Sequence, residues 1–298
     1  MDFCDVTVLT ATYNRAGYLG RLYESLQRQK DKHFQWLVID DGSTDATETL
    51  IRSFSPDFEL DYYKKQNGGK HTALNYSHPY IRGKYLVMVD SDDFLEDTAI
   101  ETIRRDWAEY GDNDSIACLS YLKRNTDGQN ISELQDEEVC ISDHIRFRLN
   151  GKRGGDRCEV LRTAAFKRYP LPEYPGERFM SEGYLWNSVA REYKTVYINR
   201  AIYIAEYLEG GLSKSGRRLR IESPRGMIDN CRMFFDKRVN TGLQIKEMWL
   251  YWAYAFFAKL SPQEAVKKSG RPVRLLINLP FGIALYLRWK SLYGRKNG

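Results

Sequence analysis

Three carboxylates stand close together directly after a short apolar run. Residues 87–89 are Val, Met and Val, and Asp90, Ser91, Asp92 and Asp93 follow them. An apolar run of this kind predicts a buried strand that delivers its next residues to the edge of a sheet. Because crowded carboxylates repel one another, the cluster favours a bound divalent cation. Mg²⁺ or Mn²⁺ is usually held by one or two protein carboxylates plus substrate phosphates, so we expect a metal shared with a phosphorylated ligand.

Strand and helix patterns alternate through the first hundred or so residues. The predicted strands lie at residues 6–11, 36–39, 60–63 and 84–89. Helices are predicted at residues 17–29, from the polar cluster at 40–45 to about residue 53, and around residues 100–110. This alternation predicts an α/β fold with a mostly parallel sheet covered by helices on both faces. Ligands bind beyond the carboxyl ends of such strands. Tyr13, Asp41 and Asp92 all follow strand ends, so we expect them to meet in one crevice.

The pattern is less regular beyond Ile116. Residues 125–138 are polar and predict an exposed loop, residues 158–161 predict a strand, and apolar residues near 185–193 predict one side of a helix. After the glycine pair at 210–211 and a basic segment at 214–220, the chain becomes aromatic and helical in pattern. We therefore place a domain boundary near residue 212.

Composition indicates a globular protein. The chain has 298 residues, of which 42% are hydrophobic and 29% charged, enough to bury a large core. Its five scattered cysteines include no CxxC pair, which favours reduced cysteines in a cytoplasmic protein. No basic-then-apolar leader opens the sequence, so we expect no cleaved signal. The net charge is +5, and no zinc finger or RNA-binding strand is recognisable, so nucleic acid is not an expected partner.

Three different short motifs stand at the ends of three predicted strands. TYNR stands at residues 12–15, DDGS at 40–43 and DSDD at 90–93. In this order they resemble the inverting glycosyltransferases of family 2, which have the GT-A fold and use nucleotide-activated sugars. The resemblance spans about residues 5–207. It implies a glycosyltransferase domain at 1–212, with a nucleotide-binding part at about 1–110 and an acceptor part at about 111–212, followed by a helical extension at 213–298.

The resemblance also implies roles for single residues. Tyr13 would pack on the nucleobase, and Asp41 would accept a hydrogen bond from the base edge, as expected for uracil. Asp90 matches the family's ribose-binding position and Asp92 its metal ligand, while Asp93 is either a supporting carboxylate or a helix cap. The implied donor-binding set is completed by Thr12, Asn14, Arg15 and, in the NGGKHTALN segment at 67–75, Lys70.

Each of these residues also has a plain structural interpretation. Tyr13 alone would be a half-buried aromatic side chain, and Asp41 alone a turn residue. The acidic cluster could be a solvated turn, although a calcium loop is disfavoured because Phe94 and Leu95 stand where a glycine is needed. Lys70 could be a solvated lysine after a glycine turn.

Glu182 is the best candidate for the catalytic base. The resemblance aligns the Leu-Trp pair at residues 185–186 with the family's leucine-tryptophan and places Glu182 where a catalytic Asp often stands. The chain departs from the family pattern here, because Ser181 replaces a carboxylate and the base is one methylene longer. Ser181 and Glu182 would equally suit a helix N-terminus. Glu177 and Asp156 are reserve candidates.

The sequence thus predicts a metal-dependent inverting glycosyltransferase with Mg²⁺ or Mn²⁺ and a nucleotide sugar, expected to be UDP-linked. The acceptor would be a glycan or a lipid-linked glycan, as in cell-surface polysaccharide synthesis. A non-catalytic nucleotide-sugar-binding protein remains an alternative. A sugar nucleotidyltransferase is disfavoured because residues 10–15 contain no glycine for its phosphate-binding loop.

The C-terminal segment carries a strong positive charge. Residues 224–298 contain fourteen Lys and Arg against four Asp and Glu. Its apolar stretches at 248–257 and 275–287 are shorter than the roughly 20 residues of a spanning helix. With their basic flanks they predict helices lying on an anionic membrane, at the inner face of the cell membrane for a cytoplasmic protein. A helical lid or a dimer contact is the alternative.

Overall fold

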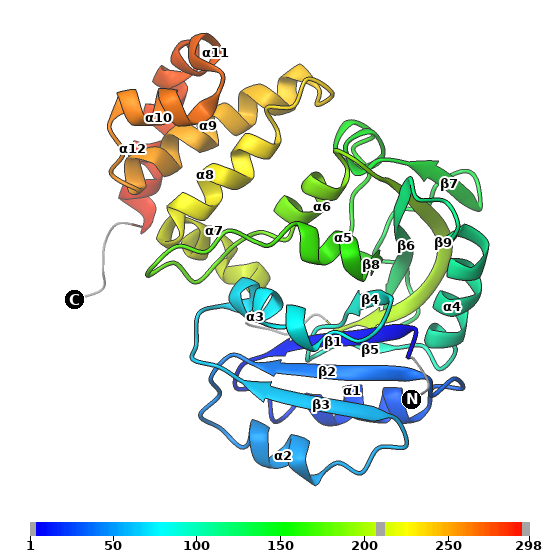
Figure 1. The fold of residues 1–298 in the computed structure, drawn as a ribbon. Helices are drawn as coiled ribbons and strands as arrows, with labels where there is room; N and C mark the ends of the chain where they lie inside the picture. Colours follow the sequence, from blue (N-terminus) through cyan, green and yellow to red (C-terminus); the bar gives the residue numbers. More distant parts are fainter. Residues whose placement is uncertain (1–3, 207–211, 294–298) are drawn as a thin grey trace. The chain divides into compact units, whose positions relative to one another are not determined.

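A computed structural model describes residues 4–206 and 212–293 of the chain (Figure 1). The chain forms two compact units. The first contains the residues up to Pro170 and the segment that begins at Ser188, and the second contains Leu171–Asn187 and the C-terminal helices.

The first unit is built on a nine-stranded sheet. The strand order is β3-β2-β1-β4-β8-β6-β9-β5, and β7 pairs with β9 beside this path. Figure 1 shows the sheet curling from β3 round to β9. The strands are β1 (Val6–Thr12), β2 (Phe34–Asp40), β3 (Glu59–Lys64), β4 (Tyr85–Met88), β5 (Phe94–Leu95), β6 (Ile116–Asn125), β7 (Val139–Ser142), β8 (Arg157–Arg162) and β9 (Lys194–Ala205).

Helices cover both faces of this sheet. They are α1 (Leu19–Gln27), α2 (Thr47–Ser53), α3 (Lys70–Tyr76), α4 (Ala99–Tyr110) and α5 (Thr163–Arg168), with short η1 (His78–Tyr80) and η2 (Ile145–Asn150). Apolar side chains of α1, α2 and α4 share one core with Val8 and Trp36 of the sheet. Helix α3 contacts β1 and β2 outside that core. Alternating side chains of β1 point to opposite faces, which explains why two layers of helices are needed.

The predicted α/β class is confirmed. Strands β1, β2, β3 and β4 form one parallel block, in which every residue of β2 is buried, as expected for a strand covered on both faces. Strands β8, β5 and β7 add antiparallel pairs, while β6 and β9 run parallel. Neither β6 nor β9 was predicted. The twelve-residue β9 joins β6, β7 and β5 and closes this half of the sheet.

The second unit is helical. Helix α6 (Gly183–Val189) begins in it, and it continues with α7 (Leu212–Glu222), α8 (Pro224–Met233), α9 (Thr241–Phe257), α10 (Pro262–Ser269), α11 (Pro272–Ile277) and α12 (Leu279–Tyr293). Helix α9 packs between α8 and α12. Ser261 and Glu264 form a capping box that starts α10, and Gly270 ends it in the left-handed conformation. Among the residues that the structure describes, no helix has the length and apolar content needed to cross a membrane.

Candidate functional site

The candidate site lies where the parallel strands end. In the register of the sheet, Thr12 of β1 pairs with Asp40 of β2, and Asp40 pairs with Lys64 of β3. The Asp41 backbone N–H donates to the Thr12 carbonyl at 2.8 Å, which extends this alignment by one residue. Because the strands are parallel, the residues that follow them emerge at the same edge. The predicted meeting of the strand ends is therefore present.

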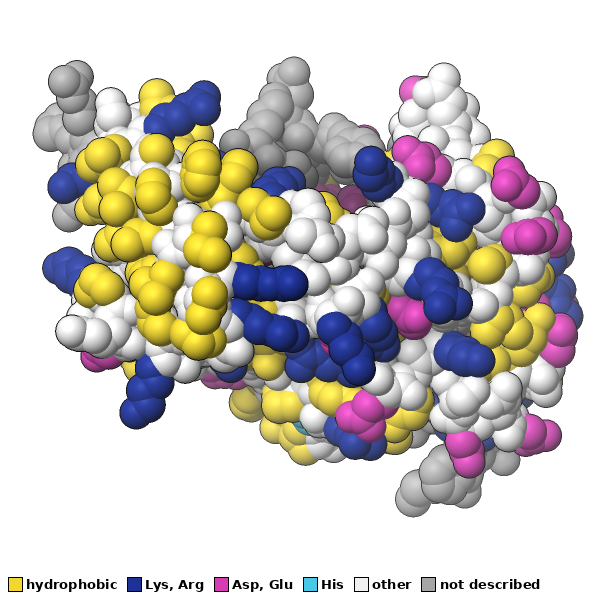
Figure 2. Space-filling view, turned by 90° about the horizontal axis from the view of Figure 1, so that it is seen from above, with side chains coloured by type: hydrophobic (Ala, Val, Ile, Leu, Met, Phe, Trp, Pro, Cys, Tyr) yellow, Lys and Arg dark blue, Asp and Glu magenta, His cyan; other side chains and the backbone are white. Residues whose placement is uncertain are grey.

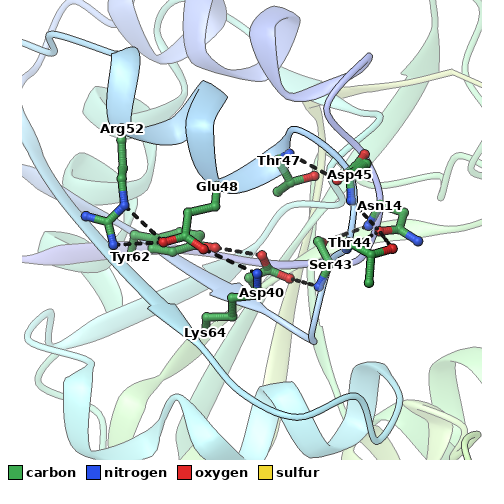
Figure 3. Close-up of polar contacts among 10 residues, drawn as sticks. All are labelled: Asn14, Asp40, Ser43, Thr44, Asp45, Thr47, Glu48, Arg52, Tyr62 and Lys64. Carbon is green, nitrogen blue, oxygen red and sulfur yellow. Dashed lines mark hydrogen bonds and ion pairs between the residues drawn. The ribbon is translucent and has the colours of Figure 1, made fainter.

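The loops after β1 and β2 are tied together through Asn14 (Figure 3). Asn14 takes a left-handed backbone conformation, with φ of 52°. Its backbone N–H donates to Ser43 Oγ at 2.8 Å, and its Oδ1 accepts the Thr44 N–H at 2.8 Å. The side chain of Asn14, predicted to bind the donor, thus fixes one loop to the other.

Asp40 is a buried support beneath this loop (Figure 3). Its carboxylate accepts the Ser43 N–H at 2.7 Å and the Tyr62 hydroxyl at 2.6 Å. Burial, together with this carboxylate, raises the pKa of Tyr62 well above its ordinary value, so the hydroxyl stays a donor. Asp40 therefore holds the turn that presents the next residue, Asp41.

Asp41 organises the glycine turn at residues 67–69. Its Oδ1 accepts from Lys65 Nζ at 2.8 Å and from the Gly68 N–H at 3.0 Å, and its Oδ2 accepts the Gly69 N–H at 2.7 Å. Gly69 has a φ of 98°, a conformation that suits glycine. The buried carboxylate thus fixes the turn that leads into α3 and sets the position of Lys70, the first residue of that helix.

Lys70 reaches the acidic cluster. Its Nζ donates to Asp90 Oδ1 at 2.5 Å. Burial opposes ionisation of Asp90, but the positive charges of Lys70 and Lys123 outweigh it and hold the pKa of Asp90 below its ordinary value. The predicted ribose-binding carboxylate is therefore ionised and already fixed in position.

Asp92 keeps most of its bonding capacity. Within the described part of the chain its carboxylate makes one ion pair, with Arg15 Nη1 at 3.6 Å, and no hydrogen bond. Its side chain is partly open to solvent. Across residues 4–206 and 212–293, no three His, Cys, Asp or Glu side chains are grouped to hold a metal ion by themselves. This donor set fits a cation held by Asp92 together with ligand phosphates, as Mg²⁺ and Mn²⁺ sites of this kind require.

These contacts form a closed chain of neighbours. Asp41 bonds Gly69, Lys70 bonds Asp90, Asp92 pairs with Arg15, and Asn14 bonds back to Ser43, two residues beyond Asp41. Thr12 is the buried last residue of β1, and Tyr13 follows it on the loop that carries Asn14 and Arg15. The predicted donor-binding residues of β1, β2 and β4 therefore surround one site. Tyr13 is 46% exposed, so the ring is available to a flat ligand.

Asp93 has a supporting role. Its carboxylate accepts the Tyr203 hydroxyl at 2.6 Å and the Glu206 N–H at 2.9 Å. The same hydroxyl accepts the Asp90 backbone N–H at 3.1 Å. Burial raises the pKa of Asp93 to about 6. Asp93 thus holds the end of β9 against the acidic turn, which consists of residues 90–93. This is the supporting role that the sequence left open.

Two cations at the site were not predicted. Lys65 follows β3 and neutralises Asp41, and its place at a strand end was a usable signal. Lys123 lies on β6, with Nζ 3.8 Å from the centre of the Tyr203 ring. Burial works against its charge, but Asp90 and Asp93 raise its pKa above the ordinary value. In the described residues Lys123 has no direct ion pair, and its ammonium group lies over the Tyr203 ring.

Glu182 and Glu177 belong to the second unit, and the base assignment remains a prediction. Glu182 stands directly before α6, and its carbonyl accepts the Leu185 N–H at 2.9 Å. Ser181 Oγ accepts the Gly183 N–H at 3.2 Å, the contact expected of a residue at a helix start. Glu177 accepts the N–H groups of Arg225 and Gly226 at 2.8 and 2.9 Å, so it caps α8.

Asp156, the other reserve candidate, is exposed in the first unit, directly before β8. Its backbone carbonyl accepts the hydroxyl of Ser132, a contact that does not involve the carboxylate. A role for Asp156 in catalysis therefore stays a prediction.

The chain is similar to known proteins in its sequence. The model of the family described as glycosyl transferase family 2 matches residues 7–170, more than half of the chain. Glycosyltransferase GlyA of Streptococcus pneumoniae is 28% identical over 225 residues, which cover 70% of this chain and 31% of GlyA. Chondroitin synthase of Pasteurella multocida is 28% identical over 154 residues, which cover 48% of this chain and 16% of that protein. The chain therefore spans less than a third of these two relatives.

Two solved structures share the fold. TarS residues 1–349 of S. aureus in complex with UDP-GlcNAc has a TM-score of 0.65 at 18% identity, and the match covers 99% of this chain and 93% of that one. Mannosyltransferase PcManGT of Pyrobaculum calidifontis, in complex with GDP-Man and Mn²⁺, has a TM-score of 0.57 at 16% identity. The match covers 98% of this chain and 88% of that one. At these identities the likeness concerns the fold.

Proposed function

The chain belongs to glycosyl transferase family 2, as its strand-end motifs predicted, and from this membership we propose that it moves a sugar from a UDP-linked donor to a glycan acceptor with inversion. The observation that carries the proposal is the closed chain of contacts from Asp41 through Lys70, Asp90, Asp92 and Arg15 back to Asn14. It surrounds one site with an aromatic ring, carboxylates and cations.

The nucleoside would bind at the Asp41 side of the site. The exposed Tyr13 ring offers a flat apolar surface for the base. Asp41 Oδ2 accepts one hydrogen bond in the structure and has a lone pair left for an N–H of the uracil edge. Asp90, held ionised by Lys70 and Lys123, would accept from ribose hydroxyls. TarS, which shares the fold, was solved with UDP-GlcNAc, which favours UDP as the nucleotide.

The diphosphate would lie among positive charges. Arg15, Lys70 and Lys123 stand on three separate elements around the acidic turn. They would attract the phosphates and offset the negative charge that grows on the leaving group. Asp92, whose carboxylate makes one ion pair with Arg15 in the described residues and no hydrogen bond, would hold Mg²⁺ or Mn²⁺. When bound, such an ion neutralises charge on the leaving diphosphate.

We assign the base role to Glu182. In a single displacement, the acceptor oxygen forms a bond to the anomeric carbon while the bond from that carbon to the phosphate oxygen breaks. Glu182 would take the hydroxyl proton, and UDP would carry away the bonding electron pair. Attack from the face opposite the leaving group inverts the anomeric centre.

The acceptor is proposed to be a glycan or a lipid-linked glycan. The sequence similarity to chondroitin synthase favours polysaccharide synthesis. A lipid-linked acceptor would place the reaction at the cytoplasmic face of a membrane, in agreement with the basic C-terminal segment.

Release of UDP tests the proposal. The protein is incubated with labelled UDP- and GDP-sugars and Mn²⁺, and free nucleotide is measured over time. We expect UDP release from one UDP-sugar, and a fall of about 100-fold or more in the rate for Glu182→Gln with an unchanged Kd for UDP. Glu222→Gln, an exposed glutamate of α7 paired with Arg218, is the matched control and should keep the full rate.

Two results would contradict the proposal in different ways. Full turnover by Glu182→Gln would show that another group takes the proton. Tight UDP binding without turnover of any sugar nucleotide would favour the alternative, a non-catalytic nucleotide-sugar-binding protein.

A further inference from the structure

The outward face of α11 and α12 is apolar. Large side chains at positions mostly three or four residues apart are exposed there, with exposed fractions of 68% at Ile277, 55% at Phe281 and 57% at Leu287. Val273, Leu276 and Ile283 complete this C-terminal apolar face. Figure 2 shows hydrophobic side chains gathered over the C-terminal helices. A helix on a water-exposed surface normally turns polar residues outward, so this face calls for an apolar partner.

The opposite side of the same helices is fixed by packing. A Cβ added at Gly282 would lie 2.2 Å from Cβ of Trp252, so α12 approaches α9 as closely as backbone allows. Trp252 Nε1 donates to the Leu275 carbonyl at 2.7 Å, and Trp249 Nε1 donates to Asn278 Oδ1 at 2.7 Å. Helices α11 and α12 are therefore held in this orientation within the second unit. Their apolar face cannot turn inward without breaking these contacts.

The charge around this face has one sign. Residues 265–298 contain eight Lys and Arg and no Asp or Glu. Arg271 is the N-cap of α11 and Arg274 lies within that helix, while Arg288 and Lys290 lie in the last two turns of α12. Dark blue side chains border the hydrophobic cluster in Figure 2. Such a basic border is complementary to an anionic surface and would repel a second copy of itself.

We propose that the C-terminal apolar face docks on an anionic lipid surface. The apolar side chains would enter the boundary between headgroups and acyl chains, and the basic residues would lie among the lipid phosphates. Tyr293, which is partly exposed at the end of α12, suits the same interface. At fifteen residues α12 is too short to span a bilayer, so the helices would lie in the plane of the membrane. The inference does not depend on the proposed sugar transfer.

Vesicle flotation tests this inference without donor or acceptor. The full chain is mixed with vesicles of phosphatidylcholine alone or of phosphatidylcholine with phosphatidylglycerol, and the bound fraction is measured. We expect binding to the anionic vesicles and about tenfold or more weaker partitioning for Leu287→Glu. The double variant Arg288→Gln/Lys290→Gln should lose binding by about tenfold or more, with a smaller dependence on salt.

Leu134→Glu is the matched control, because Leu134 is 58% exposed in a loop of the first unit, as Leu287 is in α12. It should bind vesicles like the wild type. Equal thermal midpoints for both variants would show that they fold alike. The inference is wrong if the wild type ignores anionic vesicles, or if Leu287→Glu binds as well as Leu134→Glu. Light scattering that shows a dimer dissolved by Leu287→Glu, without vesicle binding, would assign the face to a second copy and overturn it.

Discussion

Asp41 offers a sharp test of how the site is built. Its carboxylate accepts two backbone N–H groups, of Gly68 and Gly69, and pairs with Lys65, all in a buried setting. Asp41→Asn keeps the shape but removes the charge and one acceptor oxygen. In either amide orientation, at least one of the three donors then faces an NH₂ group. A lost hydrogen bond to a charged group costs about 1.5–3 kcal/mol. Lys65 also loses its ion partner, although it keeps its hydrogen bonds to the Gln66 carbonyl and to Thr72 Oγ1, so we expect about 2–4 kcal/mol in total.

Hydrogen exchange measures this cost where it arises. We expect the Gly68 and Gly69 amides of Asp41→Asn to exchange about 30-fold or more faster than in the wild type, the ratio that corresponds to about 2 kcal/mol. UDP should bind more weakly as well, because the freed turn no longer fixes Lys70. Asp57→Asn is the control. Asp57 is exposed and pairs with Lys32 at 2.8 Å, so the change should cost at most about 1 kcal/mol.

Unchanged protection of Gly68 and Gly69 in Asp41→Asn would refute this reasoning, because the carboxylate would then not hold the turn. A second check is the double variant Asp41→Asn/Lys65→Met. Since the two side chains share one interaction, its destabilisation should fall about 1 kcal/mol or more short of the sum of the single changes. Full additivity would contradict the buried pair.

Three further predictions concern separate parts of the chain. Lys123→Met keeps the packing on Tyr203 but removes a charge near the acidic turn, so calorimetry should show about tenfold weaker UDP binding. An unchanged Kd would show that Lys123 does not contribute to UDP binding. Gly282→Ala should lower the free energy of unfolding by about 2 kcal/mol or more, because its Cβ collides with Trp252, whereas Gly242→Ala, with nothing within 4 Å, should be neutral or stabilising in urea titrations. Burial, helped by Arg148, lowers the pKa of His144 to about 3. The unfolded chain therefore binds a proton at this position below about pH 6.5 that the folded chain does not. Stability should fall by about 1–2 kcal/mol from pH 7 to pH 5, and His144→Gln should lose less over that range.

The parallel half of the sheet was predictable because its signals are local. The strand predicted at residues 6–11 is β1 (Val6–Thr12), and the polar residues after each strand fall at one sheet edge because parallel strands share a direction. The acidic turn was located from the apolar run before it. Family membership followed from the order of three such turns.

The rest depends on contacts that no local pattern reveals. Strand β9 carries Asn199 and Arg200 in its middle and pairs with three different strands, so its periodicity is broken. Because β6 and β9 were missed, Lys123 and the bond between Tyr203 and Asp93 could not be foreseen. The role of Asn14 in donor binding stays a prediction. What the residue type could not show is that its side chain holds the neighbouring loop, from a residue whose backbone is left-handed.

We infer that the strand ends form one site for a nucleoside diphosphate and a cation held by Asp92. The most direct measurement is a calorimetric titration of UDP with and without Mn²⁺, on the wild type and on Asp92→Asn. Asp97→Asn is the control, since that exposed aspartate pairs with Arg28 at 3.1 Å. We expect Mn²⁺ to tighten UDP binding about tenfold or more in the wild type and in Asp97→Asn, but not in Asp92→Asn. Retention of the full Mn²⁺ effect in Asp92→Asn would contradict it.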